Sequence, residues 1–148
     1  MPELAELGVE PLGPDFTPAR LHELARGSKR ALKLLLLDQT AVVGLGNIYV
    51  AEALFDAGLH PHRIAHKLTA AQAARLHAAI VDVLSRAIDN RGTTLRDYVD
   101  ADGEVGFNQL VLSVYGRAGE PCRRCGRPIR GVVTQGRATF YCPNCQIR

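Results

Sequence analysis

The 148-residue chain lacks tryptophan, has a single methionine, and contains only 5% aromatic residues. No apolar run approaches the roughly 20 residues that a membrane-spanning helix needs, and no charged-then-apolar signal segment stands at the start. We therefore expect a cytoplasmic protein without a membrane partner. Because 47% of its residues are hydrophobic, the chain can still form a core in one domain or two small ones.

Acidic side chains are almost missing from the C-terminal part. Residues 116–148 hold seven arginines and one acid, Glu120, which leaves +6 on this stretch. Residues 1–115 carry 11 basic and 14 acidic side chains, or −3. A basic unit on a slightly acidic body predicts a polyanionic partner. A solvated basic face is the alternative that charge alone leaves open.

Cysteine occurs only four times, in two matched pairs. Cys122 and Cys125 form one CxxC turn, and Cys142 and Cys145 form a second one sixteen residues further on. Two such turns supply the four thiolates of a structural zinc site. All four coordination positions would be filled by cysteine, which leaves none for a catalytic water. A redox CxxC is the alternative, although a redox motif needs no second pair.

Capping signals predict four helices, over about residues 17–27, 29–37, 48–57 and 70–92. Thr17 and Ser28 are the expected N-caps of the first two, and Gly58 ends the third. Residues 69–72 form a capping box for the longest helix, whose stripe of apolar residues we assign to the core: Leu76, Ile80, Val83, Leu84, Ala87 and Ile88.

A β-hairpin is predicted between the two cysteine pairs, with strands at 129–131 and 139–141 and a turn at Gln135-Gly136. This places Arg137 near the tip, where it can reach nucleic acid. Alternatively, Arg137 is one of seven solvated arginines.

Two other clusters could bind metal ions, but we favour simpler explanations. The histidines at 60, 62 and 66 are expected in a surface loop between helices. The acids Asp97, Asp100, Asp102 and Glu104 lack the ordered spacing of a calcium loop, so a solvated turn is expected.

Several segments together resemble the formamidopyrimidine-DNA glycosylase family. They are Val42–Glu52, Gly92–Leu95, Val114–Arg117, and the finger from Gly119–Cys122 to Arg137–Cys142. The similarity is collinear from about Leu7 to Gln146. It implies a mainly α protein in which a helix-two-turn-helix bundle is followed by a zinc-stabilised β-hairpin. The implied domains are a linker or arm at 1–16, the DNA-binding bundle at 17–110 and the four-cysteine finger at 111–148.

The resemblance also assigns site residues. Asn47 and Arg137 match residues that hold phosphates around an extruded damaged nucleotide, and Lys33 aligns with a lysine that we assign to phosphate contact. Asn47 stands at a predicted helix start, where the positive dipole end favours a phosphate, although asparagine is also a common structural cap. Arg137 further matches an arginine credited with helping the final elimination step of strand cleavage. Residues 104–109 correspond to the lesion-capping loop.

The resemblance implies that family members begin with a β-rich catalytic domain, and we expect this domain to be absent from the present chain. The chain nevertheless starts Met1-Pro2-Glu3-Leu4, as the family does. After removal of Met1, Pro2 would expose a secondary amine able to attack an abasic-site aldehyde, with Glu3 as proton shuttle. The alternative is coincidence, since residues 2–8 also read as a linker, and an unsupported amine is not positioned for catalysis.

We therefore expect a truncated, monomeric family member that binds double-stranded DNA, preferably damaged or abasic, and holds one structural Zn²⁺. The resemblance also implies a bacterial-type, nucleoid-associated location in the cytoplasm. Base excision, which needs a closed pocket for the flipped base, is not expected. One alternative is a non-catalytic zinc-finger interaction module that binds DNA, a partner protein, or a separate catalytic domain in trans. Another is that the chain is the C-terminal piece of a full enzyme.

Overall fold

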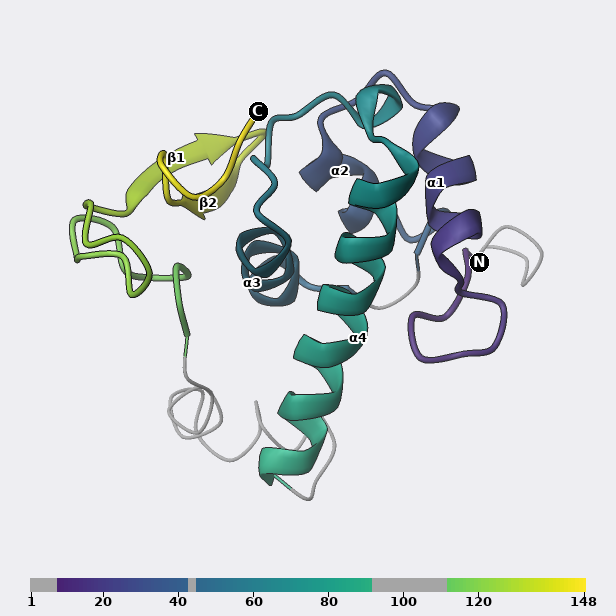
Figure 1. Cartoon of the computed structure of the whole chain (residues 1–148), viewed down its shortest axis with the longest axis horizontal. Helices are drawn as coiled ribbons and strands as arrows, with labels where there is room; N and C mark the ends of the chain where they lie inside the picture. Colours follow the sequence, from purple (N-terminus) through teal and green to yellow (C-terminus); the bar gives the residue numbers. More distant parts are fainter. Residues whose placement is uncertain (1–7, 43–44, 92–111) are drawn as a thin grey trace.

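The computed structural model describes residues 8–42, 45–91 and 112–148 (Figure 1). Its helices are α1 (Pro18–Arg26), α2 (Leu32–Leu37), α3 (Asn47–Ala57) and α4 (Ala70–Arg91), with a short 3₁₀ helix, η2 (Ala65–Lys67). Strands β1 (Arg130–Thr134) and β2 (Arg137–Tyr141) pair in antiparallel fashion. The predicted fold class, mainly α with a small β finger, is confirmed. No helix in the described ranges is long and apolar enough to cross a membrane.

The expected capping residues define the ends of three helices. Thr17 Oγ1 accepts a hydrogen bond from the Arg20 amide at 3.1 Å and so starts α1. Gly58 ends α3 in the left-handed conformation, at φ 74°. Thr69 and Gln72 exchange side-chain to backbone hydrogen bonds of 3.1 and 3.0 Å at the start of α4. These ends are local features, and for this reason sequence alone predicted them.

The predicted start of the second helix is wrong. α2 begins at Leu32 and not near Lys29, and its N-terminus has no side-chain cap. Ser28 instead accepts from the Arg30 amide at 3.2 Å. The reason is long-range pairing: Ala31 forms an antiparallel bridge with Ile64, which keeps the chain before Leu32 extended.

The main core lies where α4 packs across α1 and α3. The described side chains of the α4 stripe are buried, as predicted: Leu76, Ile80, Val83, Leu84 and Ala87. From α1, α2 and α3, Leu21, Leu36 and Leu54 complete this core at 0–1% exposure. Each fully buried leucine contributes about 1.5–3 kcal/mol of stabilisation.

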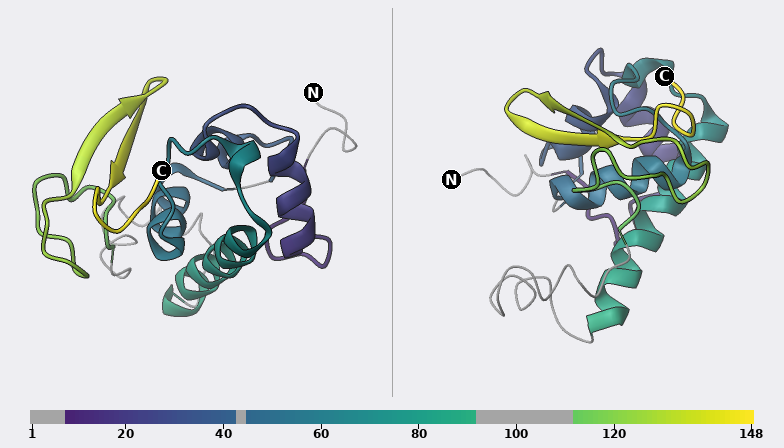
Figure 2. Two further views of the ribbon diagram at one scale, coloured as in Figure 1. Left: turned by 45° about the horizontal axis from the view of Figure 1, so that its top comes forward. Right: turned by 90° about the vertical axis from the view of Figure 1, so that its left-hand side faces the viewer.

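α3 lies between the helical core and the finger (Figures 1 and 2). Its Val50 and Leu54 face the helices, whereas Ala51 and Phe55 belong to a second apolar cluster. In that cluster they meet finger residues that include Val114, Ile129 and two of the cysteines. α3 therefore positions the finger relative to the bundle.

The hairpin is longer than predicted, with its turn at Gln135-Gly136 as expected. Both turn residues have positive φ, 47° and 81°, as a two-residue type I′ turn requires. Arg137 pairs with Thr134 next to this turn, in agreement with its predicted place near the tip.

The described part of the expected arm, residues 8–16, contacts the helical bundle at its two ends. The Gly8 and Val9 amides donate to the carbonyls of Gln39 and Ala41 at 2.8 and 3.1 Å. A Cβ at Gly8 would overlap the Ala41 backbone, so only glycine permits this approach. Phe16 is buried and its ring lies 4.7 Å from that of His77.

Candidate zinc centre and nucleic-acid interface

The four cysteine sulfurs gather at one point, as the spacing predicted. All lie within 4.8 Å of one another, with Cys122 Sγ 3.8 Å from Cys145 Sγ and Cys125 Sγ 3.5 Å from Cys142 Sγ. A tetrahedral zinc with Zn–S bonds of about 2.3 Å separates its sulfurs by about 3.8 Å. The four cysteines are thus positioned to bind one structural zinc ion, whose +2 charge would offset half of the charge of the four thiolates.

The two knuckles place their thiols in different surroundings. A hydrogen bond from the Arg127 amide lowers the pKa of Cys125 to about 6. Burial, reinforced by the neighbouring thiols, raises the pKa of Cys145 to about 12. Amides of Arg124 and Cys145 also point at Cys122 Sγ and Cys142 Sγ, both at 3.4 Å. Such knuckle amides stabilise thiolates, the form in which cysteine binds zinc.

The second knuckle is hydrogen-bonded to the turn that follows α3. Gln146 is 2% exposed; its Oε1 accepts from the Cys142 amide at 2.8 Å and its Nε2 donates to the Leu59 carbonyl at 2.9 Å. The Ile147 amide donates to the Gly58 carbonyl, and the His60 amide to the Ile147 carbonyl. The finger and the bundle are therefore joined by hydrogen bonds as well as by apolar contact.

Glu52 anchors the chain where it enters the finger. Its buried carboxylate accepts from three successive amides, those of Ser113, Val114 and Tyr115, at 2.7, 2.9 and 3.0 Å. Sequence reasoning missed this role, and the available signal was an acid within the apolar stretch 50–55 of α3. Hydrogen bonds from backbone amides to a charged carboxylate are stronger than those between neutral groups, so Glu52 holds this segment firmly.

Lys33 and Asn47 converge on the carbonyl of Ala138, the residue after Arg137. Lys33 Nζ donates to this oxygen at 2.8 Å and to Thr139 Oγ1 at 2.6 Å, and Asn47 Nδ2 donates to it at 2.9 Å. The structure thus gathers the three residues assigned to phosphate contact beside one strand end. Their contact with DNA remains a prediction.

Neither cation of this cluster, Lys33 or Arg137, is ion-paired within the part of the chain that the structure describes. Burial, together with the nearby Arg137 guanidinium, lowers the pKa of Lys33 to about 8. The buried Oδ1 of Asn47 also has no hydrogen-bond partner among the described residues. Two cations without such a pair form a natural anion site.

Asn47 does not cap its helix, the alternative that its position had left open. The N-cap of α3 is Gly46, and no side chain caps this end. The amide group of Asn47 is turned toward the hairpin instead. The positive end of the α3 dipole therefore lies beside Lys33 and Arg137.

The histidine loop differs from its predicted surface position. His60 is buried, its ring lies 4.3 Å from that of Tyr141, and its Nδ1 accepts from the His62 amide. Burial lowers the pKa of His60 to about 4. His62 is half-buried, with Nε2 2.7 Å from Thr134 Oγ1, and only His66 is exposed. The hairpin covers the first two histidines, a contact that local sequence does not reveal.

Several predicted residues lie outside the described ranges. They are Pro2, Glu3, the acids at 97, 100, 102 and 104, and the loop at 104–109. In the parts that the structure describes, the four cysteines are the one group with metal-binding geometry.

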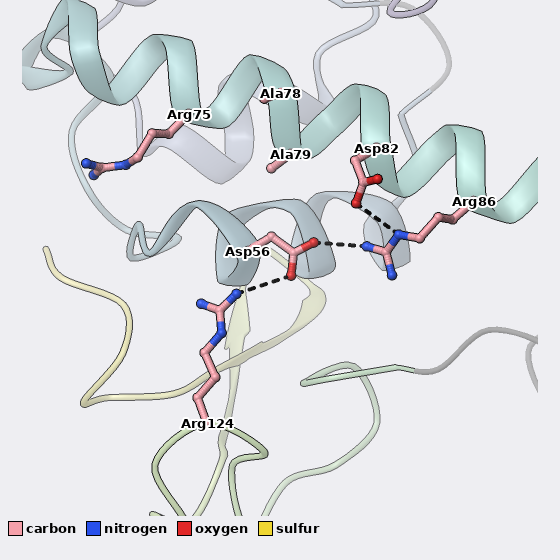
Figure 3. A pocket seen from close by; sticks show the side chains of 7 residues that line it. All are labelled: Asp56, Arg75, Ala78, Ala79, Asp82, Arg86 and Arg124. Carbon is pink, nitrogen blue, oxygen red and sulfur yellow. Dashed lines mark hydrogen bonds and ion pairs between the residues drawn. The ribbon is translucent and has the colours of Figure 1, made fainter.

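Apart from the cluster at the hairpin, a charged groove of about 710 Å³ lies between α3, α4 and the first knuckle (Figure 3). Two of its arginines are bound to acids: Asp56 contacts Arg86 at 3.0 Å and Arg124 at 3.7 Å, and Arg86 contacts Asp82 at 2.9 Å. Arg124 also lies over the Phe55 ring at 4.4 Å. The Arg124 contacts join the first knuckle to α3, and the Arg86–Asp56 pair joins α4 to α3.

Two family models match this chain. The formamidopyrimidine-DNA glycosylase H2TH domain matches residues 7–99, more than half of the chain, and the zinc finger found in FPG and IleRS matches residues 119–147. Helix bundle and finger follow one another as in that class of proteins. The chain therefore belongs to the formamidopyrimidine-DNA glycosylase family.

Individual relatives agree. The formamidopyrimidine-DNA glycosylase of Geobacillus kaustophilus is 54% identical over 145 residues, covering 98% of this chain and 53% of the relative. That of Methylococcus capsulatus is 51% identical, covering 98% of this chain and 54% of the relative. The chain thus spans about half the length of the curated relatives it matches.

Solved structures share the fold. The Lactococcus lactis glycosylase, bound non-covalently to DNA containing an AP site, superposes with a TM-score of 0.80 at 36% identity, covering 97% of this chain and 51% of that one. The MutM (FPG) protein of Thermus thermophilus gives 0.80 at 41% identity, covering 97% and 55%.

Proposed function

We propose that this chain binds double-stranded DNA, with preference for damaged or abasic sites, as the helix-two-turn-helix and zinc-finger part of a formamidopyrimidine-DNA glycosylase. One observation carries the proposal: Lys33 and Asn47 meet at Ala138, beside Arg137, and neither cation forms an ion pair with an acid of the described ranges. A DNA phosphate supplies the missing negative charge. The DNA-bound solved relatives support the same assignment.

Each residue has a distinct role in this proposal. Arg137 holds a phosphate through its planar guanidinium, which suits bidentate binding. Asn47 binds at the α3 N-terminus, where the dipole favours an anion. Lys33 adds positive charge beside Arg137, and its hydrogen bonds to Ala138 and Thr139 hold the start of β2 in place.

Replacement of Arg137 by alanine tests the proposal. We expect the affinity for an abasic-site duplex, measured by fluorescence anisotropy, to fall about tenfold, and the logarithmic salt dependence to become shallower by about one unit. Arg130→Ala is the matched control, because this exposed arginine lies at the opposite end of the hairpin. Salt-independent binding by the unmodified chain would contradict DNA backbone contact.

We further propose that base excision and strand cleavage need catalytic groups in addition to those of this chain, with Arg137 assisting the final elimination step. Excision of an oxidised purine by the purified chain is therefore expected to be undetectable. Borohydride trapping on an abasic duplex is expected to yield no covalent adduct, with a full-length family member as positive control. An adduct that disappears in Pro2→Ala would instead assign Pro2 as a working nucleophile.

A further inference from the structure

A separate groove of about 390 Å³ lies between α2 and the hairpin turn. Arg30, just before α2, and Arg137, at the start of β2, both line it, and the remaining lining residues are Leu34, Leu37, Asp38 and Gln135. This space is several times the roughly 30 Å³ that a water molecule occupies in the liquid. The groove therefore adjoins the phosphate site proposed above and has room for another charged group.

Arg30 is held in this groove by one weak contact. Its side chain is 48% exposed, and Nη1 donates to Asp38 Oδ2 at 2.9 Å. Its other guanidinium nitrogens have no hydrogen-bond partner among the described residues. Exposed ion pairs of this kind stabilise little and exchange readily. The guanidinium is thus available to a stronger anion.

Asp38 does not depend on Arg30 for its position. Its Oδ1 accepts from the Thr40 amide at 2.9 Å and from the Thr40 hydroxyl at 2.7 Å. These bonds from Thr40, more than the ion pair with Arg30, lower the pKa of Asp38. Loss of Arg30 to another partner would leave the Asp38 turn intact.

On the basis of the DNA binding proposed above, we propose that Arg30 is a further phosphate-binding residue. Arg30 leaves Asp38 and binds the DNA phosphodiester that neighbours the one held at Arg137, within the groove between α2 and the hairpin turn. An arginine offers two parallel N–H groups to a phosphate, a stronger arrangement than its single bond to Asp38. The DNA contact surface then extends from α3 across the hairpin turn to α2.

The groove of Figure 3 does not offer the same site. Its Arg86 bonds two acids, and its Arg124 is occupied by Asp56, the Phe55 ring and the Phe55 carbonyl. Asp56 also lies nine residues after Asn47 on α3, about 14 Å along the helix axis. Arg86 and Asp82 consequently serve as a matched control pair for Arg30 and Asp38.

The test is a double-mutant cycle with anisotropy titrations of an abasic-site duplex from about 50 to 300 mM salt. Arg30→Gln is expected to weaken binding about fivefold to tenfold at roughly 100 mM salt and to reduce the salt slope by about one unit. Asp38→Asn, which keeps the acceptor for Thr40, is expected to strengthen binding severalfold, because it releases Arg30. The strengthening should vanish when Arg30→Gln is present in the same chain.

The controls Arg86→Gln and Asp82→Asn change net charge by the same amounts and should leave affinity and slope unchanged. An unchanged slope in Arg30→Gln would overturn the inference, as would an Asp38→Asn gain that persists without Arg30. If Arg137→Ala weakens binding but Arg30→Gln does not, only this inference fails. If the unmodified chain shows no salt-dependent binding, the proposed function fails as well.

Discussion

Lys33 shows how one residue combines a structural and an electrostatic role. Its side chain is only 2% exposed, yet its amine carries two hydrogen bonds to the hairpin. Resemblance assigned this lysine to phosphate contact, and the structure places its amine against the strand backbone beside Arg137. Its influence on DNA would therefore include the position of the hairpin as well as charge.

The lowered pKa of Lys33 predicts a pH dependence of stability. The folded chain releases this proton at about pH 8, whereas the unfolded chain releases it near the ordinary value of 10.5. Between these values the unfolded state binds more protons, so rising pH favours the folded state. Urea titrations of the zinc-loaded proteins give the free energy of unfolding of the unmodified chain and of Lys33→Met. From about pH 8 to 10, the stability of the unmodified chain should increase relative to that of Lys33→Met.

The exposed Lys29 provides the control for this comparison. Lys29→Met is expected to show no such shift over the same range. A difference between the unmodified chain and Lys33→Met that stays constant with pH would contradict the prediction.

At the scale of the element, α3 connects the helical core to the finger. Both of its faces are packed, and its Glu52 carboxylate is buried. One face packs into the helical core and the other against the finger, while Glu52 holds residues 113–115. Its N-terminus points to the proposed phosphate site and its C-terminal turn binds the second knuckle. A change in α3 would therefore affect both the core and the finger.

Glu52→Gln should reveal this coupling. The substitution replaces one accepting oxygen by a donor that faces backbone amides, so we expect a loss of about 2 kcal/mol in the free energy of unfolding. Denaturant titration of zinc-loaded protein measures it. Glu23→Gln on α1, whose acid is exposed in a pair with Arg20, should change the same quantity by less than about 1 kcal/mol. Equal effects would argue against an anchoring role for Glu52.

At the scale of the whole molecule, two apolar clusters differ in their dependence on metal. The larger cluster joins the helices and contains no cysteine, whereas the smaller one includes Cys122 and Cys142. The finger exposes Val133 and has few large apolar residues of its own, so zinc supplies its cohesion. Loss of the metal should therefore unfold the finger and leave the helical part folded.

We expect removal of zinc by a strong chelator to leave most of the helical circular dichroism while the hairpin loses its structure. DNA affinity should fall at least about tenfold, because Arg137 and Ala138 lose their fixed place beside Asn47. Circular dichroism, amide hydrogen exchange and anisotropy on the same sample test this, with zinc added back as the control. Undiminished DNA binding without zinc would place the interface elsewhere.

The sequence by itself determined the zinc ligands, the caps of three helices, the buried stripe of α4 and the hairpin turn. Each depends on residues close together in the chain, whose spacing or backbone preference is sufficient. The resemblance further identified Lys33, Asn47 and Arg137 as a group.

Only the tertiary structure decided where α2 begins, that His60 is buried, what Glu52 binds and how the phosphate-site residues meet. The contacts of Lys33 and Asn47 with the hairpin join residues 91 to 106 positions apart. The start of α2 depends on pairing between Ala31 and Ile64. The hairpin contacts form because the finger packs on α3, and the Ala31–Ile64 bridge forms because the helical part folds back on itself. No local pattern encodes either juxtaposition.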